Sequence, residues 1–180
     1  METIKLHDRR FRVSISYEQI EESVRRLAGR LNADYAGRET PLFLGVLNGS
    51  FMFMAELMKH ISFDCEISFV KLASYEGTAS TGTVRQLIGL SGDLHGRHVI
   101  IVEDIVDTGT CIERLGEALR GQSPASLAVS TLLFKPDAYR GKTPPEYYAI
   151  SVPNRFIVGF GLDYDQLGRN LKDLYEAIDE

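Results

Sequence analysis

Residues 99–112 of the chain read VIIVEDIVDTGTCI, and this stretch decides the fold. Four apolar residues run into two adjacent carboxylates, Glu103 and Asp104, and then into Asp107 and a short segment of hydroxyl and glycine residues. The apolar run predicts a buried strand from His98 to Glu103, and apolar residues recur at helical spacing after the glycine. A strand that runs directly into a helix is typical of an α/β fold.

The rest of the chain repeats this alternation of strands and helices. Ser16 and Gln19 form a capping box in front of apolar residues at helical spacing, which predicts a helix over about 17–32. Further predicted elements are strands at Leu42–Leu47, Cys65–Leu72, Ser126–Phe134 and Phe156–Leu162, and helices over 51–60 and about 171–178. We therefore expect an α/β fold with a largely parallel central sheet flanked by helices. Ligands bind such folds at the carboxyl ends of the strands.

One long segment has no regular pattern. Residues 73–85 are rich in small and polar side chains and predict a loop. A loop of this length is uncommon inside a compact domain and is often a lid or a binding loop. Plain surface variability is the other interpretation.

The composition limits the class of protein. The chain has 180 residues, of which 44% are apolar, so it can bury one sizeable core, and we expect a single domain over 1–180. Its 20 basic and 25 acidic side chains give a formal net charge of −5, which argues against general binding to nucleic acid. The longest apolar runs fall far short of the roughly 20 residues of a membrane span.

The N-terminus and the two cysteines limit the class of protein further. The N-terminus lacks an apolar signal core, so we expect a cytoplasmic protein without a membrane partner. Cys65 and Cys111 lack a metal-ligand spacing and predict neither a disulfide framework nor a structural zinc site.

The segment 108–112 has the features of a phosphate-binding loop. The first turn of a helix offers unpaired backbone N–H groups to an anion, and Gly109 permits its close approach. The lysine and glycine spacing of the nucleoside-triphosphatase loop is absent. Three carboxylates would repel a phosphate unless they bind sugar hydroxyls, a divalent cation or a transferred proton, so a phosphorylated sugar is favoured. Taken singly, each acidic residue could instead be an ordinary helix cap.

Residues 102–110 resemble the phosphoribosyl-diphosphate signature of type I phosphoribosyltransferases, and residues 103–109 are similar to its hypoxanthine-guanine branch. Four further stretches resemble that branch in the same order: 47–54 its first active-site loop, Ser74 and Tyr75 the start of its mobile lid, 132–136 its base-reading strand end, and 152–169 its C-terminal site. The resemblance implies a Rossmann-like fold with a small hood from the N- and C-terminal segments.

The resemblance also implies a reaction. The 5-phosphoribosyl group moves from phosphoribosyl diphosphate to N9 of hypoxanthine or guanine, which gives IMP or GMP and pyrophosphate. Mg²⁺ is the implied cofactor, and a homodimer or homotetramer is the implied assembly. The implied catalytic residue is Asp107. The implied ribose and phosphate ligands are Glu103, Asp104, Thr108, Gly109, Thr110, Cys111 and Ile112; the purine ligands are Lys135, Phe156, Ile157 and Asp163; the pyrophosphate ligands are Asn48, Gly49, Ser74, Tyr75 and Arg169; and the metal ligands are Asp163, Glu103 and Asp104.

Base choice follows from hydrogen bonding at Lys135. The ammonium of Lys135 can donate to O6 of hypoxanthine or guanine, whereas adenine presents an amino donor there and should be rejected.

Two residues depart from the family pattern. Asn48 stands where many members of the branch carry a lysine or arginine, so its backbone N–H rather than a side-chain charge would serve the diphosphate. Cys111 stands where a threonine is usual, and a thiol is the poorer hydrogen-bond donor.

Two alternatives remain open from the sequence. One is a xanthine-preferring phosphoribosyltransferase. The other is an RNA-binding regulator with the phosphoribosyltransferase fold, which would need a basic surface; the sequence offers only the short clusters Arg9-Arg10 and Arg25-Arg26.

Overall fold

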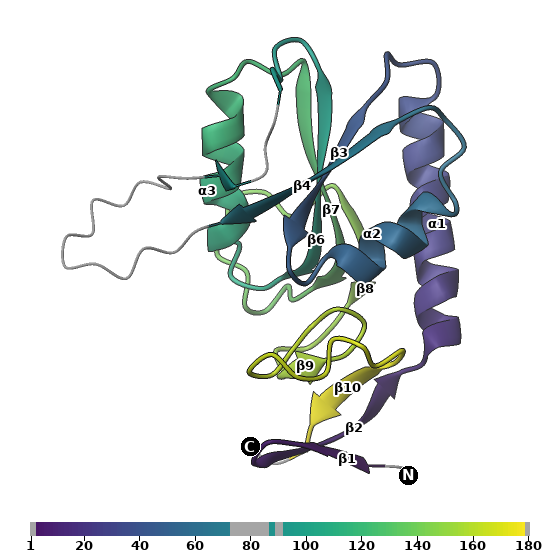
Figure 1. Ribbon diagram of the computed structural model, residues 1–180, viewed down its shortest axis with the longest axis vertical. Coiled ribbons are helices and arrows are strands. Elements are labelled where there is room, and N and C mark those ends of the chain that lie inside the picture. Colours follow the sequence, from purple (N-terminus) through teal and green to yellow (C-terminus); the bar gives the residue numbers. More distant parts are fainter. Residues whose placement is uncertain (1–2, 73–86, 89–91, 179–180) are drawn as a thin grey trace, which may run out of the picture.

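A computed structural model describes residues 3–72, 87–88 and 92–178. Its larger sheet has the strand order β5-β4-β3-β6-β7-β8, and neighbouring strands run parallel except for β5, which is antiparallel to β4 (Figure 1). The strands are β3 (Leu42–Leu47), β4 (Glu66–Leu72), β5 (Leu87–Ile88), β6 (His98–Val106), β7 (Ser126–Phe134) and β8 (Tyr147–Ser151). The largely parallel sheet is confirmed, and β3 and β7 have the predicted bounds. The short strand β8 was not predicted.

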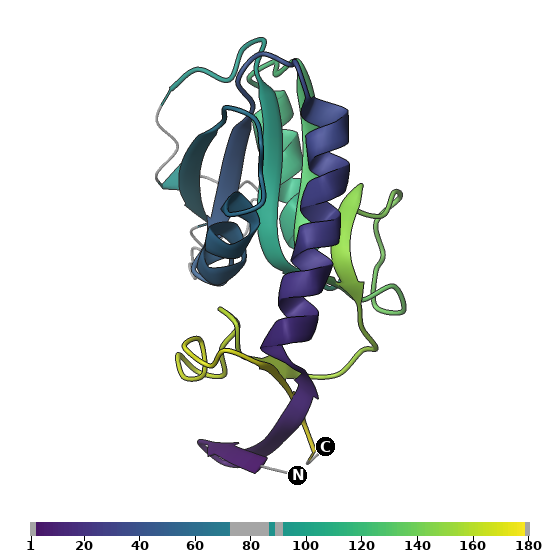
Figure 2. The same cartoon turned by 90° about the vertical axis from the view of Figure 1, so that its right-hand side faces the viewer.

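Helices cover both faces of this sheet (Figure 2). They are α1 (Tyr17–Tyr35), α2 (Phe51–Met58) and α3 (Thr110–Arg120). The predicted capping box in front of α1 is present. Because side chains alternate along a strand, Ile100 of β6 packs with α1 and α2 while Ile101 packs with α3. This two-sided burial explains why β6 reads as a continuous apolar run.

The terminal segments build a second, smaller sheet with the order β1-β2-β10-β9 and antiparallel pairing. Its strands are β1 (Thr3–Leu6), β2 (Arg9–Ile15), β9 (Ile157–Val158) and β10 (Leu174–Ala177). Figures 1 and 2 show it beyond one end of the larger sheet. This is the expected hood.

The predicted helix over 171–178 is wrong, because Leu174–Ala177 is strand β10. It pairs with β2 on one side and β9 on the other. Pairing on both sides satisfies its backbone groups, which overrides the weak helical spacing of a short segment. We predicted a strand over Phe156–Leu162, but the strand observed there, β9, covers only Ile157–Val158. Gly159 and Gly161 have φ of +100° and +102°, a backbone conformation that ends the strand after Val158.

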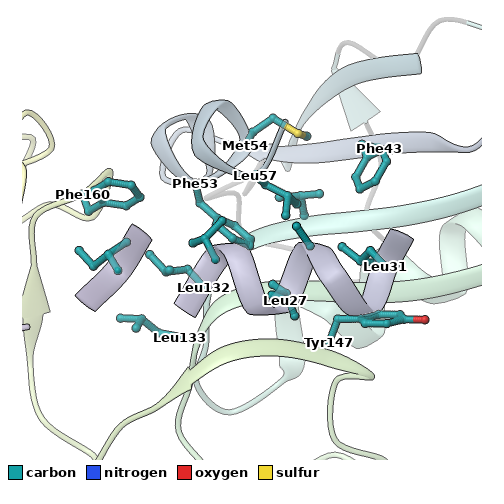
Figure 3. Close-up of a cluster of buried hydrophobic side chains, with 14 of the residues drawn as sticks. Leu27, Leu31, Phe43, Phe53, Met54, Leu57, Leu132, Leu133, Tyr147 and Phe160 are labelled. Atoms are coloured by element: carbon teal, nitrogen blue, oxygen red, sulfur yellow. The ribbon is translucent and has the colours of Figure 1, made fainter. Parts of the chain in front are cut away.

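The hood shares a core with the larger sheet. Phe160 is 2% exposed and belongs to the same buried cluster as Phe53 of α2 and Leu132 of β7. Figure 3 shows Phe160 at one end of this cluster. Shared burial therefore fixes the hood relative to the carboxyl ends of the parallel strands. Within the described part of the chain, no helix has the length and apolar character needed to cross a membrane.

Candidate active site

Strand β6 extends three residues beyond its predicted end, to Val106. The extension forms because Val106 still pairs with Phe134 of β7. Glu103 and Asp104 therefore lie within the strand, and only Asp107 and the following residues form the turn into α3. The carboxylates are held by sheet pairing rather than by a loop.

The turn between β6 and α3 keeps helix amides available. The first hydrogen bond of α3 runs from Glu113 N to Gly109 O at 3.0 Å, so the amides of Thr110, Cys111 and Ile112 precede it. Of these, the Thr110 N–H makes a long hydrogen bond of 3.5 Å to Thr108 Oγ1. Gly109 has φ of +89°, and a Cβ there would strike the ring of Tyr139. Glycine is thus required twice, for its backbone angle and for space. The segment has the amides that a phosphate needs at a helix N-terminus.

A cavity of about 230 Å³ lies beside this turn. Its lining residues are Asp104, Ile105, Asp107, Lys135, Phe156, Ile157, Leu162 and Asp163. All but Ile105 and Leu162 are residues that the sequence proposed. Ile105 was flanked by candidate residues and Leu162 preceded one, which is the signal that could have found them. The volume is below the range of about 300–1,000 Å³ usual for drug-sized ligands, so the cavity suits a small ring system.

Two polar residues on the cavity wall form an ion pair. Lys135 Nζ donates to Asp107 Oδ2 at 2.8 Å and lies 3.5 Å from Asn154 Oδ1. The Lys135 side chain is 8% exposed, whereas that of Asp107 is 44% exposed. A buried ammonium needs such a partner, because removing one member would leave a charge uncompensated. We predicted separate roles for Asp107 and Lys135 from the sequence, and the fold brings the two side chains into direct contact. Asn154 was missed by the sequence reading.

Glu103 is 6% exposed, and the half-buried Asp104 follows it in the strand. Burial raises the pKa of Glu103 well above its usual range, and the neighbouring Asp104 carboxylate adds to this effect. Burial also raises the pKa of Asp104, while nearby Arg169 partly opposes the shift. Donors or a cation brought by a ligand would stabilise the ionised carboxylates.

Cys111 contacts this pair. Its Sγ donates to Glu103 Oε2 at 3.6 Å. Burial, together with Glu103, raises the pKa of Cys111 to about 12. The thiol is therefore neutral at physiological pH and donates its hydrogen bond to Glu103. Any contact of Cys111 with a phosphate would come from its backbone amide.

We expect Glu103→Gln to stabilise the ligand-free protein at alkaline pH. Because the folded-state pKa of Glu103 is raised, the unfolded chain releases this proton first as the pH climbs above about 4.3. The wild type then loses stability with rising pH, by at most about 1.4 kcal/mol per pH unit, until Glu103 ionises in the folded state as well. Glutamine removes this loss. At pH 8 we expect a Tm increase on the order of 2–4 °C, equivalent to about 1 kcal/mol in a chain of this size.

Thermal unfolding from pH 4 to 8 measures this effect. Glu117→Gln, at an exposed glutamate of α3, is the matched control and should leave the difference between pH 4 and pH 8 unchanged. Equal Tm–pH curves for Glu103→Gln and wild type would contradict the assignment of Glu103 as a destabilising buried acid.

The segment after β3 packs against the same carboxylates. A Cβ on Gly49 would collide with the Asp104 carboxyl, and a Cβ on Gly161 would collide with the carbonyl of Gly49. The peptide bond between Leu47 and Asn48 is cis, and Asn48 is exposed. Three distant parts of the chain thus meet at two glycines, and the expected diphosphate residues Asn48 and Gly49 lie next to Asp104.

Arg169 and Asp163, which were expected to meet substrate, bind each other. Arg169 Nη2 lies 2.7 Å from Asp163 Oδ1, and Nη1 donates to Gly161 O at 2.9 Å. Asp163 Oδ2 accepts from the backbone N–H of Gln166 at 2.8 Å. The two side chains remain 22% and 24% exposed. The ion pair fixes both groups at the edge of the cavity and leaves the guanidinium with further N–H donors.

Comparison with known proteins decides the family. The model of the phosphoribosyl transferase domain family matches residues 16–165. The chain belongs to this family. The matched range contains β6, the turn into α3 and all residues that line the cavity.

Similar proteins within the family are named for purine phosphoribosyl transfer. The hypoxanthine-guanine phosphoribosyltransferase of Streptococcus pneumoniae is 40% identical over 161 residues, which is 89% of each chain. That of Streptococcus agalactiae is 43% identical with the same coverage. Among solved structures, the Bacillus anthracis enzyme of that name has a TM-score of 0.81 at 34% identity, covering 92% of this chain and 96% of its own. The hypoxanthine phosphoribosyltransferase of Trypanosoma cruzi has a TM-score of 0.81 at 29% identity, covering 92% and 95%.

The metal ligands implied by the family resemblance do not form a preformed cage. Among the described residues, the three His, Cys, Asp or Glu side chains whose ligand atoms approach within 4.8 Å of one another are Glu21, Glu56 and His60, between α1 and α2. Asp163, Glu103 and Asp104 nevertheless offer carboxylate oxygens, which suit Mg²⁺. Protein sites commonly hold Mg²⁺ through one or two carboxylates together with water and substrate phosphates. The residues present fit that open arrangement.

One part of the expected site lies outside the described residues: Ser74 and Tyr75, together with the loop predicted over 73–85.

A larger groove of about 610 Å³ runs along β2 and β8. Its charged residues satisfy one another, because Glu176 pairs with Arg12 at 2.6 Å and with Arg155 at 3.0 Å. The smaller cavity, whose wall contains the Asp107–Lys135 ion pair, is the better candidate for the functional site.

Proposed function

We propose that the protein is a purine salvage enzyme that transfers the 5-phosphoribosyl group from phosphoribosyl diphosphate to N9 of hypoxanthine or guanine. One observation carries the proposal: the Asp107–Lys135 pair and Phe156 line one small cavity beside the helix amides of 110–112. A base and a sugar phosphate would therefore be held next to each other. The similarity to hypoxanthine-guanine phosphoribosyltransferases supports this substrate pair.

Asp107 is proposed as the acid–base group. As the N9 lone pair forms a bond to the anomeric carbon, the bond from that carbon to the diphosphate breaks and its electron pair leaves with pyrophosphate. The purine then sheds its N7 proton, and the Asp107 carboxylate, at the cavity wall, accepts it. Lys135, 2.8 Å away, holds the carboxylate in place.

Lys135 is also proposed to select the base. An ammonium has three donors, so Lys135 can keep Asp107 and still donate to O6 of a 6-oxopurine. Adenine would place an amino group against that donor and leave both unsatisfied. Phe156 would stack on the purine, and the residues Ile157 and Asp163 would contact its other edge.

The remaining residues are proposed to bind the donor. The 5-phosphate would rest on the amides of 108–112, and the carboxylates Glu103 and Asp104 would accept the ribose hydroxyls. Asn48, Gly49 and Arg169 would bind the diphosphate. Mg²⁺, held by Asp163 with Glu103 and Asp104 available to a second ion, would supply positive charge to the leaving diphosphate when bound.

A turnover assay tests the proposal. The purified protein is given phosphoribosyl diphosphate and Mg²⁺ with hypoxanthine, guanine, xanthine, adenine or uracil in separate reactions. We expect nucleotide from hypoxanthine and guanine and none above background from adenine and uracil. Preference for xanthine would replace the substrate assignment. Salt-dependent RNA binding without turnover of any base would instead establish the regulator. Sedimentation of the same sample tests the expected homodimer or homotetramer.

A further inference from the structure

The aromatic wall of the cavity has a cation placed against it. The Cζ atom of Arg9 lies 5.4 Å from the ring centroid of Phe156 and 5.5 Å from that of Tyr164. The two rings meet edge to face at 5.4 Å and 80°. Phe156 lines the cavity, and Arg9 lies outside the set of lining residues. The guanidinium thus lies over the Phe156 ring, and Arg9 itself does not line the cavity.

The N-terminal hairpin holds Arg9 in this position. Arg9 begins β2 and pairs with Leu6 of β1. In the turn between these strands, Asp8 Oδ1 accepts a hydrogen bond from the Tyr164 hydroxyl at 2.7 Å. His7 Nε2 lies 3.2 Å from the carbonyl of Asp165. These contacts dock the turn on Tyr164 and Asp165, and they hold the start of β2, where Arg9 lies.

Phe156 needs this support more than a core ring would. It is 37% exposed and comes directly before the two-residue strand β9. Phe11 packs against it at a centroid distance of 6.2 Å and is itself fully buried. A guanidinium within about 6 Å of a ring centroid is attracted to the ring face. This attraction favours one orientation of the Phe156 ring.

We propose that Arg9 is a positioning residue for the purine, acting through Phe156. The proposal rests on the proposed function of the cavity. Arg9 touches neither base nor sugar phosphate; it holds the ring on which the base stacks. The N-terminal hairpin is thereby a part of the base site, although it precedes the region matched by the family model.

The test compares the KM for hypoxanthine with the KM for phosphoribosyl diphosphate in full-length variants. Arg9→Gln, which removes the charge and keeps a long side chain, should raise the KM for hypoxanthine about three- to tenfold, with kcat and the KM for the donor within about twofold. Arg9→Lys retains a cation and should restore most of the affinity. Lys5→Ala removes an exposed cation of the same hairpin and should change neither KM.

A double-mutant cycle separates positioning from general loss of structure. In a Phe156→Leu background, Arg9→Gln should add no further increase in the KM for hypoxanthine, because the ring it acts on is absent. An additive increase, an equal rise in both KM values, or failure of Arg9→Lys to restore affinity would overturn the proposal. If the wild type turns over hypoxanthine and Arg9→Gln has an unchanged KM for hypoxanthine, the Arg9 proposal is wrong and the proposed function stands. If the wild type shows no turnover, both the proposed function and this inference are contradicted.

Discussion

Replacing Asp107 by asparagine should lower kcat with hypoxanthine by about a hundredfold or more, as the loss of a general base does. Asparagine retains an oxygen that can accept the hydrogen bond from Lys135, which is 2.8 Å from Asp107 in the structure. The ion pair is lost but the shape of the cavity wall is kept. We therefore expect the affinity for the nucleotide product to stay within about threefold, since the amide oxygen still accepts a hydrogen bond from the Lys135 ammonium.

Steady-state kinetics and product binding by calorimetry measure the two quantities on the same preparations. Asp137→Asn, at an exposed aspartate in the loop after Lys135, is the matched control and should keep wild-type kcat. An unchanged kcat in Asp107→Asn would show that another group moves the proton. A parallel loss of nucleotide binding would indicate that Asp107 mainly organises the cavity.

Lys135→Ala should reduce kcat/KM for hypoxanthine and guanine by about a hundredfold. A hydrogen bond to a charged group contributes about 1.5–3 kcal/mol, which corresponds to about a 10- to 150-fold effect. The variant also leaves Asp107 without its partner, which moves the expected loss toward the upper end of this range. The donor site is built from other elements, so binding of phosphoribosyl diphosphate should change little.

Competition kinetics with each base, together with direct titration of the donor, distinguish these effects. Lys142→Ala, at an exposed lysine, controls for the loss of positive charge and should match wild type. Equal weakening of base and donor would argue that Lys135 supports the fold rather than reads O6. Adenine gaining relative to hypoxanthine in Lys135→Ala would strengthen the selectivity argument.

The sequence was most informative where structure is local. The bounds of β3 and β7, the capping box of α1 and the turn from β6 into α3 follow from spacing within a few residues. Local pattern was least informative at the C-terminus, where Leu174–Ala177 became a strand. One of its two partner strands, β2, lies near the other end of the chain, and Ala177 pairs with Phe11 there. No window of neighbouring residues contains that information.

The candidate site, too, was only partly predictable from local sequence patterns. Motifs named nearly all the residues that line the cavity, but not which side chains contact one another. Motifs gave no sign that Lys135 holds Asp107, that Arg169 holds Asp163, or that Cys111 donates to Glu103. Each of these contacts joins side chains whose directions depend on how separate segments pack. The roles assigned to Ser74 and Tyr75 stay predictions.

The order of buried strands and helices follows from the sequence alone, and with it the position of the turn from β6 into α3. Periodicity encodes these features because backbone geometry repeats every two or every 3.6 residues. Tertiary structure alone decided which charged groups meet and that the N-terminal hairpin supports Phe156 through Arg9. The physical reason is that such contacts depend on the relative placement of β2, β9 and β6, which is set by pairing and shared burial between segments far apart in sequence.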